Sequence, residues 1–255
     1  MKELPRFPVF SVITVVRNRQ SEIARTIQSV GSQTLASSIE HIIYDGASVD
    51  DTVFVAEQTH SLAEKVIISE PDEGIYDALN KAFSVARGRY IAVLHSDDIF
   101  NDERVLEDIL GIFVSEDADI VYADSKVVDE CGRVVGHVRP SRRAGRWLFP
   151  DQVSHEAIFF TSDVARQLTP PFDTSYKIAA DLKQQLLILD KRQNLACYFD
   201  RVVVVFRMGG ESTRSWKAYL TGLIEARRAW NDVNGRFGTF YCLSKILIRL
   251  GRRFA

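Results

Sequence analysis

Apolar runs rich in β-branched residues alternate with segments of helical periodicity through the first hundred residues of the chain. The runs are residues 9–16, 42–44, 66–68 and 90–94. Between them, apolar side chains recur every three or four positions, which is the spacing of one helix face. Parallel strands need a long and usually helical connection, and such crossovers are almost always right-handed. The order therefore predicts a parallel β-sheet flanked by helices.

Three helices are expected between these strands. The first carries Ile23, Ile27 and Val30, and the third carries Ala78, Leu79, Ala82, Phe83 and Ala86. The second begins at Asp51 or Thr52, and its spacing predicts that Val55, Thr59 and Leu62 face inward.

The regular alternation ends near residue 98. A helix through Val105, Ile109 and Phe113 begins at Asn101 or Asp102, and strand-like runs follow at residues 119–123, 133–138, 157–160 and 202–206. Mixed strands after a parallel half indicate a second lobe built on the same sheet. We therefore expect one domain over residues 1–210, followed by a helical tail over residues 211–255.

Two adjacent carboxylates, Asp97 and Asp98, follow the fourth apolar run after Ser96. Open α/β sheets bind ligands at this edge, and unpaired carboxylates are costly to bury. A hard cation such as Mg²⁺ or Mn²⁺ accepts one or two carboxylates and completes its shell with phosphate oxygens and water. The motif alone leaves two interpretations open, a metal site against a diphosphate and an ordinary helix cap.

Length and composition predict one sizeable core, because the chain has 255 residues, of which 46% are hydrophobic and 26% charged. The cysteines, Cys131, Cys197 and Cys242, are odd in number, far apart and without metal-ligand spacing, which is typical of a reducing cytosol. No apolar run approaches the roughly 18 residues of a membrane span, and residues 1–6 lack the hydrophobic stretch of a signal peptide. We expect a cytoplasmic protein.

The net charge of −2 is unevenly distributed. From residue 201 onward eleven Lys and Arg residues stand against three acids, so this end is basic and the remainder acidic. Apolar residues at helical spacing run from Trp216 to Trp230 and, after a loop over residues 231–235, from Phe240 to Leu250. A basic amphipathic end is typical of a helix lying on an anionic membrane surface. A helix packed on the protein's own core explains the pattern equally well.

Four segments, residues 11–19, 45–52, 69–81 and 96–98, carry a resemblance to a known family. In sequence and order they resemble the family 2 glycosyltransferases, with further similarity at residues 154–156, 179–181 and 209–213. The resemblance implies the GT-A fold, a Rossmann-like, mostly parallel central sheet flanked by helices, here with a C-terminal helical extension. It also implies a nucleotide-sugar-binding half over about residues 1–100 and an acceptor half over residues 101–210.

The same resemblance implies the roles of individual residues. Donor-binding residues would be Thr14, Val16, Arg17, Asn18, Asp45, Tyr76, Asp77, Asn80, Ser96 and Asp97. Asp98 would bind the cofactor, Mn²⁺ or Mg²⁺, and Asp181 would be the catalytic base, while His155 and Glu156 would approach the acceptor or the diphosphate. Structural alternatives stay open: a turn for Asp45, a favourable first-turn charge for Asp77, a loop tie for Asn80, a helix cap for Asp181 and simple packing for His155.

Glycosyl transfer with inversion needs a base for the acceptor hydroxyl and a positive charge beside the departing phosphate. We therefore expect an inverting, metal-dependent hexosyltransferase. It would move a sugar from a nucleoside-diphosphate sugar, with UDP favoured, to a glycan or lipid-linked acceptor in cell-surface polysaccharide synthesis. The expected location is the cytoplasm or, through the tail, the cytoplasmic membrane face, and no nucleic-acid partner is expected.

Two other functions fit parts of the pattern. A sugar-nucleotide nucleotidyltransferase would favour a glycine-rich basic loop after the first strand, and residues 17–20 contain no glycine. A non-catalytic sugar-nucleotide-binding or membrane-scaffold protein would bind nucleotide without turnover. Dehydrogenase and P-loop functions are excluded, because neither Gly-x-Gly-x-x-Gly nor Gly-x-x-x-x-Gly-Lys-Ser/Thr occurs.

Overall fold

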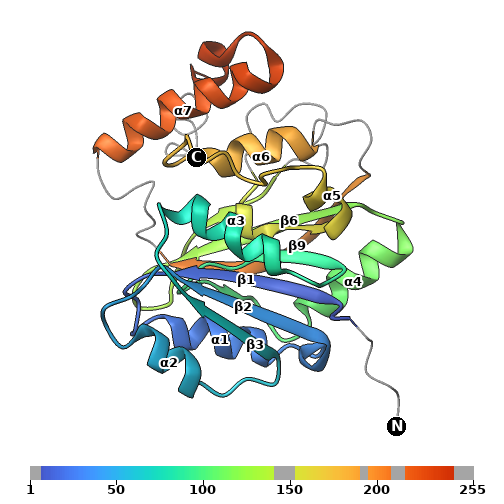
Figure 1. The fold of residues 1–255 in the computed structure, drawn as a ribbon. Helices are drawn as coiled ribbons and strands as arrows, with labels where there is room; N and C mark the ends of the chain where they lie inside the picture. Colours follow the sequence, from blue (N-terminus) through green and yellow to red (C-terminus); the bar gives the residue numbers. More distant parts are fainter. Residues whose placement is uncertain (1–6, 141–152, 190–194, 208–215, 244–255) are drawn as a thin grey trace.

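The computed structural model describes residues 7–140, 153–189, 195–207 and 216–243. Within these residues nine strands form one sheet in the order β3-β2-β1-β4-β8-β6-β9-β5, with β7 paired to β6. Figure 1 shows this sheet between helices on both of its faces, with a further helical layer near the C-terminal end of the chain.

The strands of the first half are parallel, as the alternation predicts. They are β1 (Phe10–Val16), β2 (Ile39–Asp45), β3 (Glu64–Ser69) and β4 (Tyr90–Val93). Because β1 lies between β2 and β4, the chain moves outward from β1 to β3 and then crosses back to the other side of β1. Such a reversal opens a crevice at the carboxyl ends of the central strands, where ligands of α/β sheets bind.

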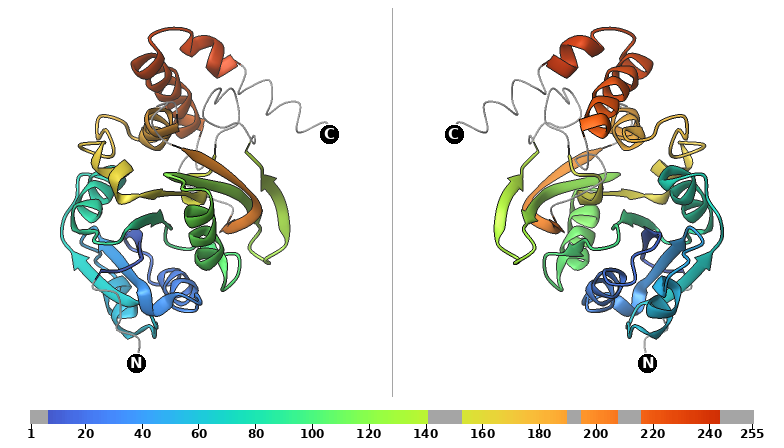
Figure 2. Two further views of the ribbon diagram at one scale, coloured as in Figure 1. Left: turned by 90° about the vertical axis from the view of Figure 1, so that its right-hand side faces the viewer. Right: turned by 90° about the vertical axis from the view of Figure 1, so that its left-hand side faces the viewer.

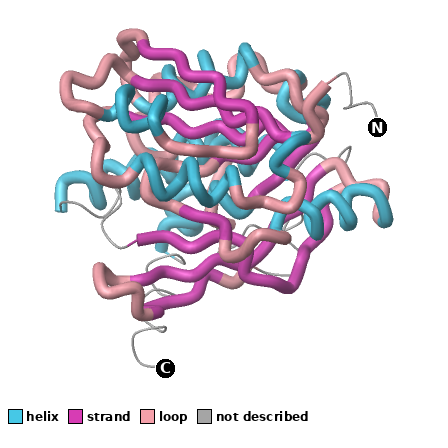
Figure 3. Tube along the Cα trace, turned by 90° about the horizontal axis from the view of Figure 1, so that it is seen from below, coloured by secondary structure: helices cyan, strands magenta, loops and turns pink. Residues whose placement is uncertain are grey.

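The second half extends the same sheet, whose strands Figure 3 shows in magenta, with mixed strand directions. Its strands are β5 (Ile99–Phe100), β6 (Ile120–Val128), β7 (Val134–Val138), β8 (Ile158–Thr161) and β9 (Ala196–Arg207). Strand β8 is antiparallel to both β4 and β6, and β9 is parallel to β6. A second lobe on the same sheet is therefore confirmed, while β5 was not expected from the sequence.

Helices cover both faces of the sheet (Figures 1 and 2). On one face lie α1 (Ile23–Gly31), α2 (Thr52–Gln58) and α4 (Val105–Ser115). On the other lie α3 (Ile75–Val85), α5 (Ser162–Arg166) and α6 (Ala180–Leu189), with α7 (Trp216–Asn234) against α6. Two 3₁₀ helices, η1 (Ala36–Ser38) and η2 (His155–Ala157), precede β2 and β8.

Alternate residues of each strand enter different cores, because side chains of a strand point to opposite faces. Ile13 and Tyr44 pack with α3, α5 and α6, whereas Val12 packs with α4 and Ile43 packs against α1 and α2. Burial on both faces explains why these strands appear in the sequence as unbroken apolar runs.

The second helix is shorter than its spacing predicts, so the inward position of Leu62 is wrong. Helix α2 ends at Gln58, and Leu62 is 68% exposed. The Nζ atom of Lys65 donates to the carbonyl oxygens of Ala56, Glu57 and Thr59 at distances of 2.7–2.8 Å. These carbonyls close the last turn, and a cation at a helix C-terminus stabilises that end.

The tail also differs from the expectation. Helix α7 continues into the predicted loop and ends at Asn234, and the next residue, Gly235, has a φ of 76°, which suits glycine just after a helix end. Its buried residues are Glu225, Ala226 and Ala229, whereas Ile224 is 69% exposed. The remaining apolar tail residues, 244–250, and the similarity at residues 209–213 lie outside the described residues. None of the described helices combines the length and apolar character that a membrane span requires.

Candidate functional site

The loops after β1, β2 and β4 meet at one edge of the sheet, beside the crossover between β1 and β4. Val16 and Asp45 occupy paired positions at the ends of β1 and β2, and the loop after β4 carries Asp97 and Asp98. Three of these loop residues, Asn18, Ala47 and Asp97, have positive φ angles of 51°, 53° and 86°. Non-glycine residues rarely adopt such backbone angles, and they gather at sites where ligands bind.

Helix α1 holds the loop that carries the two aspartates. The buried Thr26 hydroxyl donates to the carbonyl oxygen of Asp98 at 3.0 Å and accepts from the backbone N–H of Asp97 at 2.9 Å. Arg25 lies one residue earlier, and its Nη1 is 3.1 Å from Oδ1 of Asp97. Arg207 at the end of β9 approaches the same oxygen at 3.7 Å. Sequence reasoning missed Thr26, Arg25 and Arg207, because none of them belongs to a motif that the sequence analysis used.

Asp45 forms the turn that the sequence left as an alternative. Its carboxylate accepts from the backbone N–H of Ser48 at 2.8 Å and from the Ser69 hydroxyl at 2.7 Å, and it also accepts from the Ser48 hydroxyl. A carboxylate offers about four acceptor positions. The side chain is therefore rigidly held, with acceptor capacity left for one further donor.

Asn18 connects the loops after β1 and β2. Its backbone N–H donates to the Ser48 hydroxyl at 2.7 Å, and its Oδ1 accepts from the Val49 N–H at 2.9 Å. The neighbouring Arg17 is exposed, and its Cδ lies near Gly46, where a Cβ would come within 3.4 Å of it. The structure thus brings Val16, Arg17, Asn18 and Asp45 together at this edge.

The Thr14 side chain is directed into the sheet instead. It is fully buried, donates to the carbonyl oxygen of Leu94 at 2.7 Å and lies 2.9 Å from Nε2 of His41. Because Leu94 directly precedes the loop that carries Asp97 and Asp98, Thr14 fixes the end of β4. Its hydroxyl has no place in a donor-binding surface.

The three predicted residues of α3 have separate surroundings. Asp77 accepts from the backbone N–H of Glu73 at 3.1 Å and pairs with Lys81 at 3.1 Å, and both contacts lower its pKa. This is the first-turn charge that the sequence allowed. The Asn80 amide makes two hydrogen bonds with the backbone of Phe172. It donates to the carbonyl oxygen at 2.8 Å and accepts from the N–H at 2.9 Å. Asn80 therefore ties down a loop.

The Tyr76 side chain points toward α6. It is buried, stacks on Phe172 with ring centroids 5.8 Å apart, and donates its hydroxyl proton to Oδ1 of Asp181 at 3.4 Å. Burial and the Asp181 carboxylate raise the pKa of Tyr76 far above its ordinary value. The phenol thus remains a proton donor to Asp181, which lies in the first turn of α6.

His155 and Glu156 lie in η2, between the loop after β4 and α6. The His155 ring stands 6.2 Å from the His95 ring, and Oε1 of Glu156 is 3.6 Å from Nε2 of His95. Burial lowers the pKa of both histidines, that of His95 to about 4, so both rings are neutral near pH 7. Neither ring nitrogen of His155 has a hydrogen-bond partner in the described structure.

A group of acids faces these neutral rings. Desolvation raises the pKa of Asp98 well above its usual range, and the neighbouring carboxylates of Glu156 and Asp97 raise it further. Burial also raises the pKa of Glu156, and Asp181 adds to this effect. Electrostatic interactions therefore link Asp98, through Glu156, to Asp181 in the first turn of α6.

This arrangement fits a divalent cation at Asp98 and Asp97. No group of three or more metal-binding side chains is assembled among the described residues. A magnesium-like ion needs only one or two protein carboxylates when substrate phosphates and water supply the rest. A cation there would offset the repulsion that raises the pKa of Asp98, so its donor set and its charge both suit such an ion.

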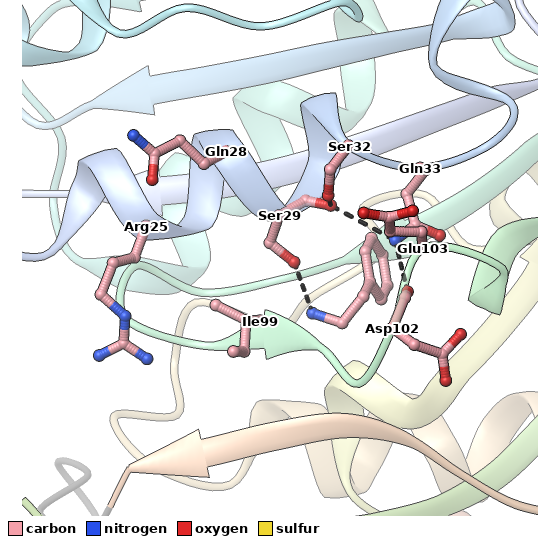
Figure 4. A pocket seen from close by; sticks show the side chains of 9 residues that line it. Arg25, Gln28, Ser29, Ser32, Gln33, Ile99, Asp102 and Glu103 are labelled. Atoms are coloured by element: carbon pink, nitrogen blue, oxygen red, sulfur yellow. Dashed lines mark hydrogen bonds between the residues drawn. The ribbon is translucent and has the colours of Figure 1, made fainter.

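A separate pocket lies between α1 and the β5 segment, with Arg25 in its lining (Figure 4). Its polar side chains are already used: the Ser29 hydroxyl accepts from the Phe100 N–H, and Gln33 donates to the carbonyl oxygen of Asp102, each at 2.8 Å. These contacts hold β5 against α1. Because β5 follows the loop that carries Asp97 and Asp98, they also hold the end of that loop.

The fold is that of the GT-A glycosyltransferases. S. aureus TarS 1–349 in complex with UDP-GlcNAc superimposes with a TM-score of 0.67 at 16% identity, over 92% of this chain and 70% of that chain. The mannosyltransferase PcManGT from Pyrobaculum calidifontis, in complex with GDP-Man and Mn²⁺, gives 0.65 at 15% identity, over 98% and 76%. At such identities the likeness concerns the fold alone.

Sequence similarity identifies the family. Residues 11–170 match Glycosyl transferase family 2, and the chain therefore belongs to this family and is a glycosyltransferase. One relative, the PGL/p-HBAD biosynthesis glycosyltransferase of Mycobacterium bovis, is 28% identical over 177 residues, which is 68% of this chain and 67% of that protein. The resemblance inferred from the sequence motifs is confirmed, while Asp181 and α7 lie beyond the matched residues.

Proposed function

We propose that the protein is an inverting, metal-dependent hexosyltransferase that uses a nucleoside-diphosphate sugar. The observation that carries this proposal is the pairing of two acidic sides across one site. Asp97 and Asp98 lie in the loop after β4, Asp181 lies in the first turn of α6, and Glu156 interacts electrostatically with both sides. An inverting transfer needs these two sides, one to hold the leaving diphosphate and one to take a proton.

The donor would lie across the edge formed by the loops after β1, β2 and β4. Asp45 would accept a hydrogen bond from the base or ribose, and the loop from Val16 to Asn18, with Ser96, would border the nucleotide. Asp98, supported by Asp97, would hold a Mn²⁺ or Mg²⁺ ion, which when bound neutralises charge on the departing diphosphate. Thr14 would act by fixing the end of β4, Asp77 by holding the loop before α3, and Asn80 by holding the backbone at Phe172.

The acceptor hydroxyl would approach from the α6 side. Its oxygen forms a bond to the anomeric carbon as the bond from that carbon to the diphosphate breaks, with the electron pair leaving on the nucleoside diphosphate. The hydroxyl proton passes to the Asp181 carboxylate, which Tyr76 orients. His155, whose ring nitrogens have no hydrogen-bond partner in the described structure, and the Glu156 carboxylate would contact the acceptor or the diphosphate.

UDP is the favoured nucleotide, and a glycan or lipid-linked molecule the favoured acceptor. TarS has been crystallised with UDP-GlcNAc, and the similar Mycobacterium bovis protein is described by its role in PGL/p-HBAD biosynthesis. PcManGT, which binds GDP-Man with Mn²⁺, supports both a metal and the alternative base. The proposed product belongs to cell-surface polysaccharide or glycolipid synthesis.

A thermal-shift panel tests donor binding directly. UDP, GDP, UDP-glucose, UDP-GlcNAc and GDP-mannose would be compared with and without Mn²⁺, because a ligand that binds only the folded state raises its apparent stability. The proposal predicts a Mn²⁺-dependent shift for one nucleotide series, followed by sugar release from that donor. A protein that binds a donor but never releases its sugar would be a binding module instead.

Peripheral membrane association on the cytoplasmic face is a second part of the proposal. Trp216, Ile224, Phe237 and Phe240 are 63–76% exposed, and basic residues accompany them. Exposed aromatic and aliphatic side chains among cations suit an anionic lipid surface. A chain ending at Gly238 lacks Phe240 and the last four basic residues, so it should bind phosphatidylglycerol vesicles more weakly, whereas unaltered vesicle binding would contradict this part.

A further inference from the structure

A carboxylate of α7 accepts hydrogen bonds from the backbone segment that directly precedes α6. Oε1 of Glu225 accepts from the N–H of Lys177 at 2.9 Å, and Oε2 accepts from the N–H groups of Ile178 and Ala179 at 2.8 and 3.0 Å. The Glu225 side chain is buried, with only 9% of the residue exposed. Three consecutive backbone donors thus converge on one charged acceptor.

Such convergence fixes the backbone of the whole segment. Hydrogen bonds to a charged group are stronger than neutral ones, and a buried N–H left without an acceptor is costly. The three donors cannot turn independently without losing their common acceptor. Ala179 is followed by Ala180, where α6 begins, and then by Asp181, so Glu225 sets where the helix starts and where the Asp181 carboxylate points.

Two further residues of the same α7 face hold the flanks of this segment. Arg228 donates to the Ser175 hydroxyl at 2.9 Å and lies 4.4 Å from the centroid of the Tyr176 ring. Asp232 accepts from the Tyr176 hydroxyl at 2.7 Å and from Lys183 at 3.1 Å. Of the three, Glu225 alone bonds the residues that run directly into α6.

We propose that Glu225 is a positioning residue for sugar transfer, which acts by holding the Asp181 carboxylate beside Tyr76 and the acceptor. The proposal rests on the proposed role of Asp181 as the base. It makes α7 part of the catalytic machinery, although this helix lies outside residues 11–170 that match the family. In sequence Glu225 looks like one polar residue of a tail helix, and only the fold reveals its partners.

Glu225→Gln is the main test, because it keeps size and one oxygen but turns an N–H group against the backbone donors. Hydrolysis of the best donor from the thermal-shift panel would be followed as nucleoside-diphosphate release, with water as the acceptor. We expect kcat to fall about 10- to 100-fold, the scale of a misplacement near 1 Å, with donor KM and Kd within about twofold. Glu40→Gln alters another buried carboxylate that accepts from backbone N–H groups, at the opposite end of β2 from Asp45, so it is the matched control and should keep kcat within about twofold.

A double-mutant cycle separates positioning from general damage. If Glu225 acts through Asp181, Glu225→Gln should lower the turnover of the wild type but change the residual turnover of Asp181→Asn by less than twofold. An equal loss in both backgrounds, or no loss in the wild type, would overturn the inference. If Asp181→Asn itself kept full turnover, the proposed base would fail first, which distinguishes the two failures.

Folding of the variant is controlled with a second substitution. Glu225→Asp keeps the charge and withdraws it by one methylene, so it should lose less turnover than Glu225→Gln at equal thermal stability. Failure of both variants to fold would make Glu225 a purely structural residue and would contradict the proposal.

Discussion

The hydroxyl of Tyr76 lies 3.4 Å from Oδ1 of Asp181, although 105 positions separate the two residues in the chain. One belongs to α3 and the other to α6. This contact connects the two helices at the point where the donor and the acceptor are proposed to meet. It gives the proposed base a fixed orientation.

Tyr76→Phe tests this contact. The ring keeps its stacking on Phe172, and only the hydroxyl is lost. The contact is long, so we expect turnover to fall about three- to tenfold with unchanged donor affinity. Tyr198→Phe, which removes a hydroxyl bound to Asp124 at 2.6 Å, is the matched control for loss of a phenol–carboxylate bond. Equal turnover for Tyr76→Phe and wild type would mean that the contact does not orient the base.

Asp98→Asn should change stability in opposite directions with and without ligand. Without metal, the substitution removes a buried charge that Glu156 and Asp97 repel. Tm should therefore rise by about 2–4 °C for each kcal/mol gained in the free energy of unfolding. With Mn²⁺ and donor, the ligand-induced rise of Tm should disappear. Asp129→Asn, in a distant turn, controls for the loss of one negative charge. A full Mn²⁺-dependent shift in Asp98→Asn would remove Asp98 from the metal site.

Asn80→Ala should weaken the fold and spare donor binding. Both hydrogen bonds to the Phe172 backbone are lost, which costs about 1–3 kcal/mol in the free energy of unfolding. Urea unfolding would measure this loss, and titration with the nucleotide would give Kd, expected within about twofold of wild type. A tenfold weaker Kd at unchanged stability would show instead that Asn80 touches the donor.

His41 predicts a loss of stability in mild acid. Burial, aided by Lys65, lowers its pKa to about 3, whereas the unfolded side chain titrates near 6.5. The unfolded state alone binds the proton between these values, so stability is complete above about pH 6.5 and falls as the pH drops toward 3. The slope for this one group is about 1.4 kcal/mol per pH unit.

His41→Gln isolates this group. Glutamine can still donate to the Thr14 hydroxyl, which the ring nitrogen contacts at 2.9 Å, but it does not titrate. Urea unfolding between pH 7 and 5 should therefore show a steeper loss for the wild type than for the variant, by about one proton. Parallel curves would mean that His41 is not held neutral in the folded protein.

Much of the first half followed from the sequence, because its parallel strands and helices are local patterns. The apolar runs before Asp45 and Asp97 placed both carboxylates at one sheet edge, as the structure has them. The placement of β8 between β4 and β6 could not be predicted, since it depends on pairings between distant segments.

The supporting contacts of the site were also hidden in the sequence. Thr26 sits among apolar residues of α1, and its role depends on a loop some 70 positions later. The sequence predicted the buried face of the tail helix from its apolar residues, whereas Glu225 is an acidic residue that is buried. Its burial is possible only because three backbone donors compensate its charge.

The most direct test of the account is sugar release by Asp181→Asn. Asparagine keeps the shape of aspartate but cannot take a proton at neutral pH. Nucleoside-diphosphate release from the best donor would be measured together with the donor Kd, for this variant and the wild type. We predict a loss of about 10²–10⁴-fold in turnover, the weight of a general base, at nearly unchanged Kd. Near-normal turnover in a folded variant would contradict the account and leave Asp181 as a favourable charge in the first turn of α6.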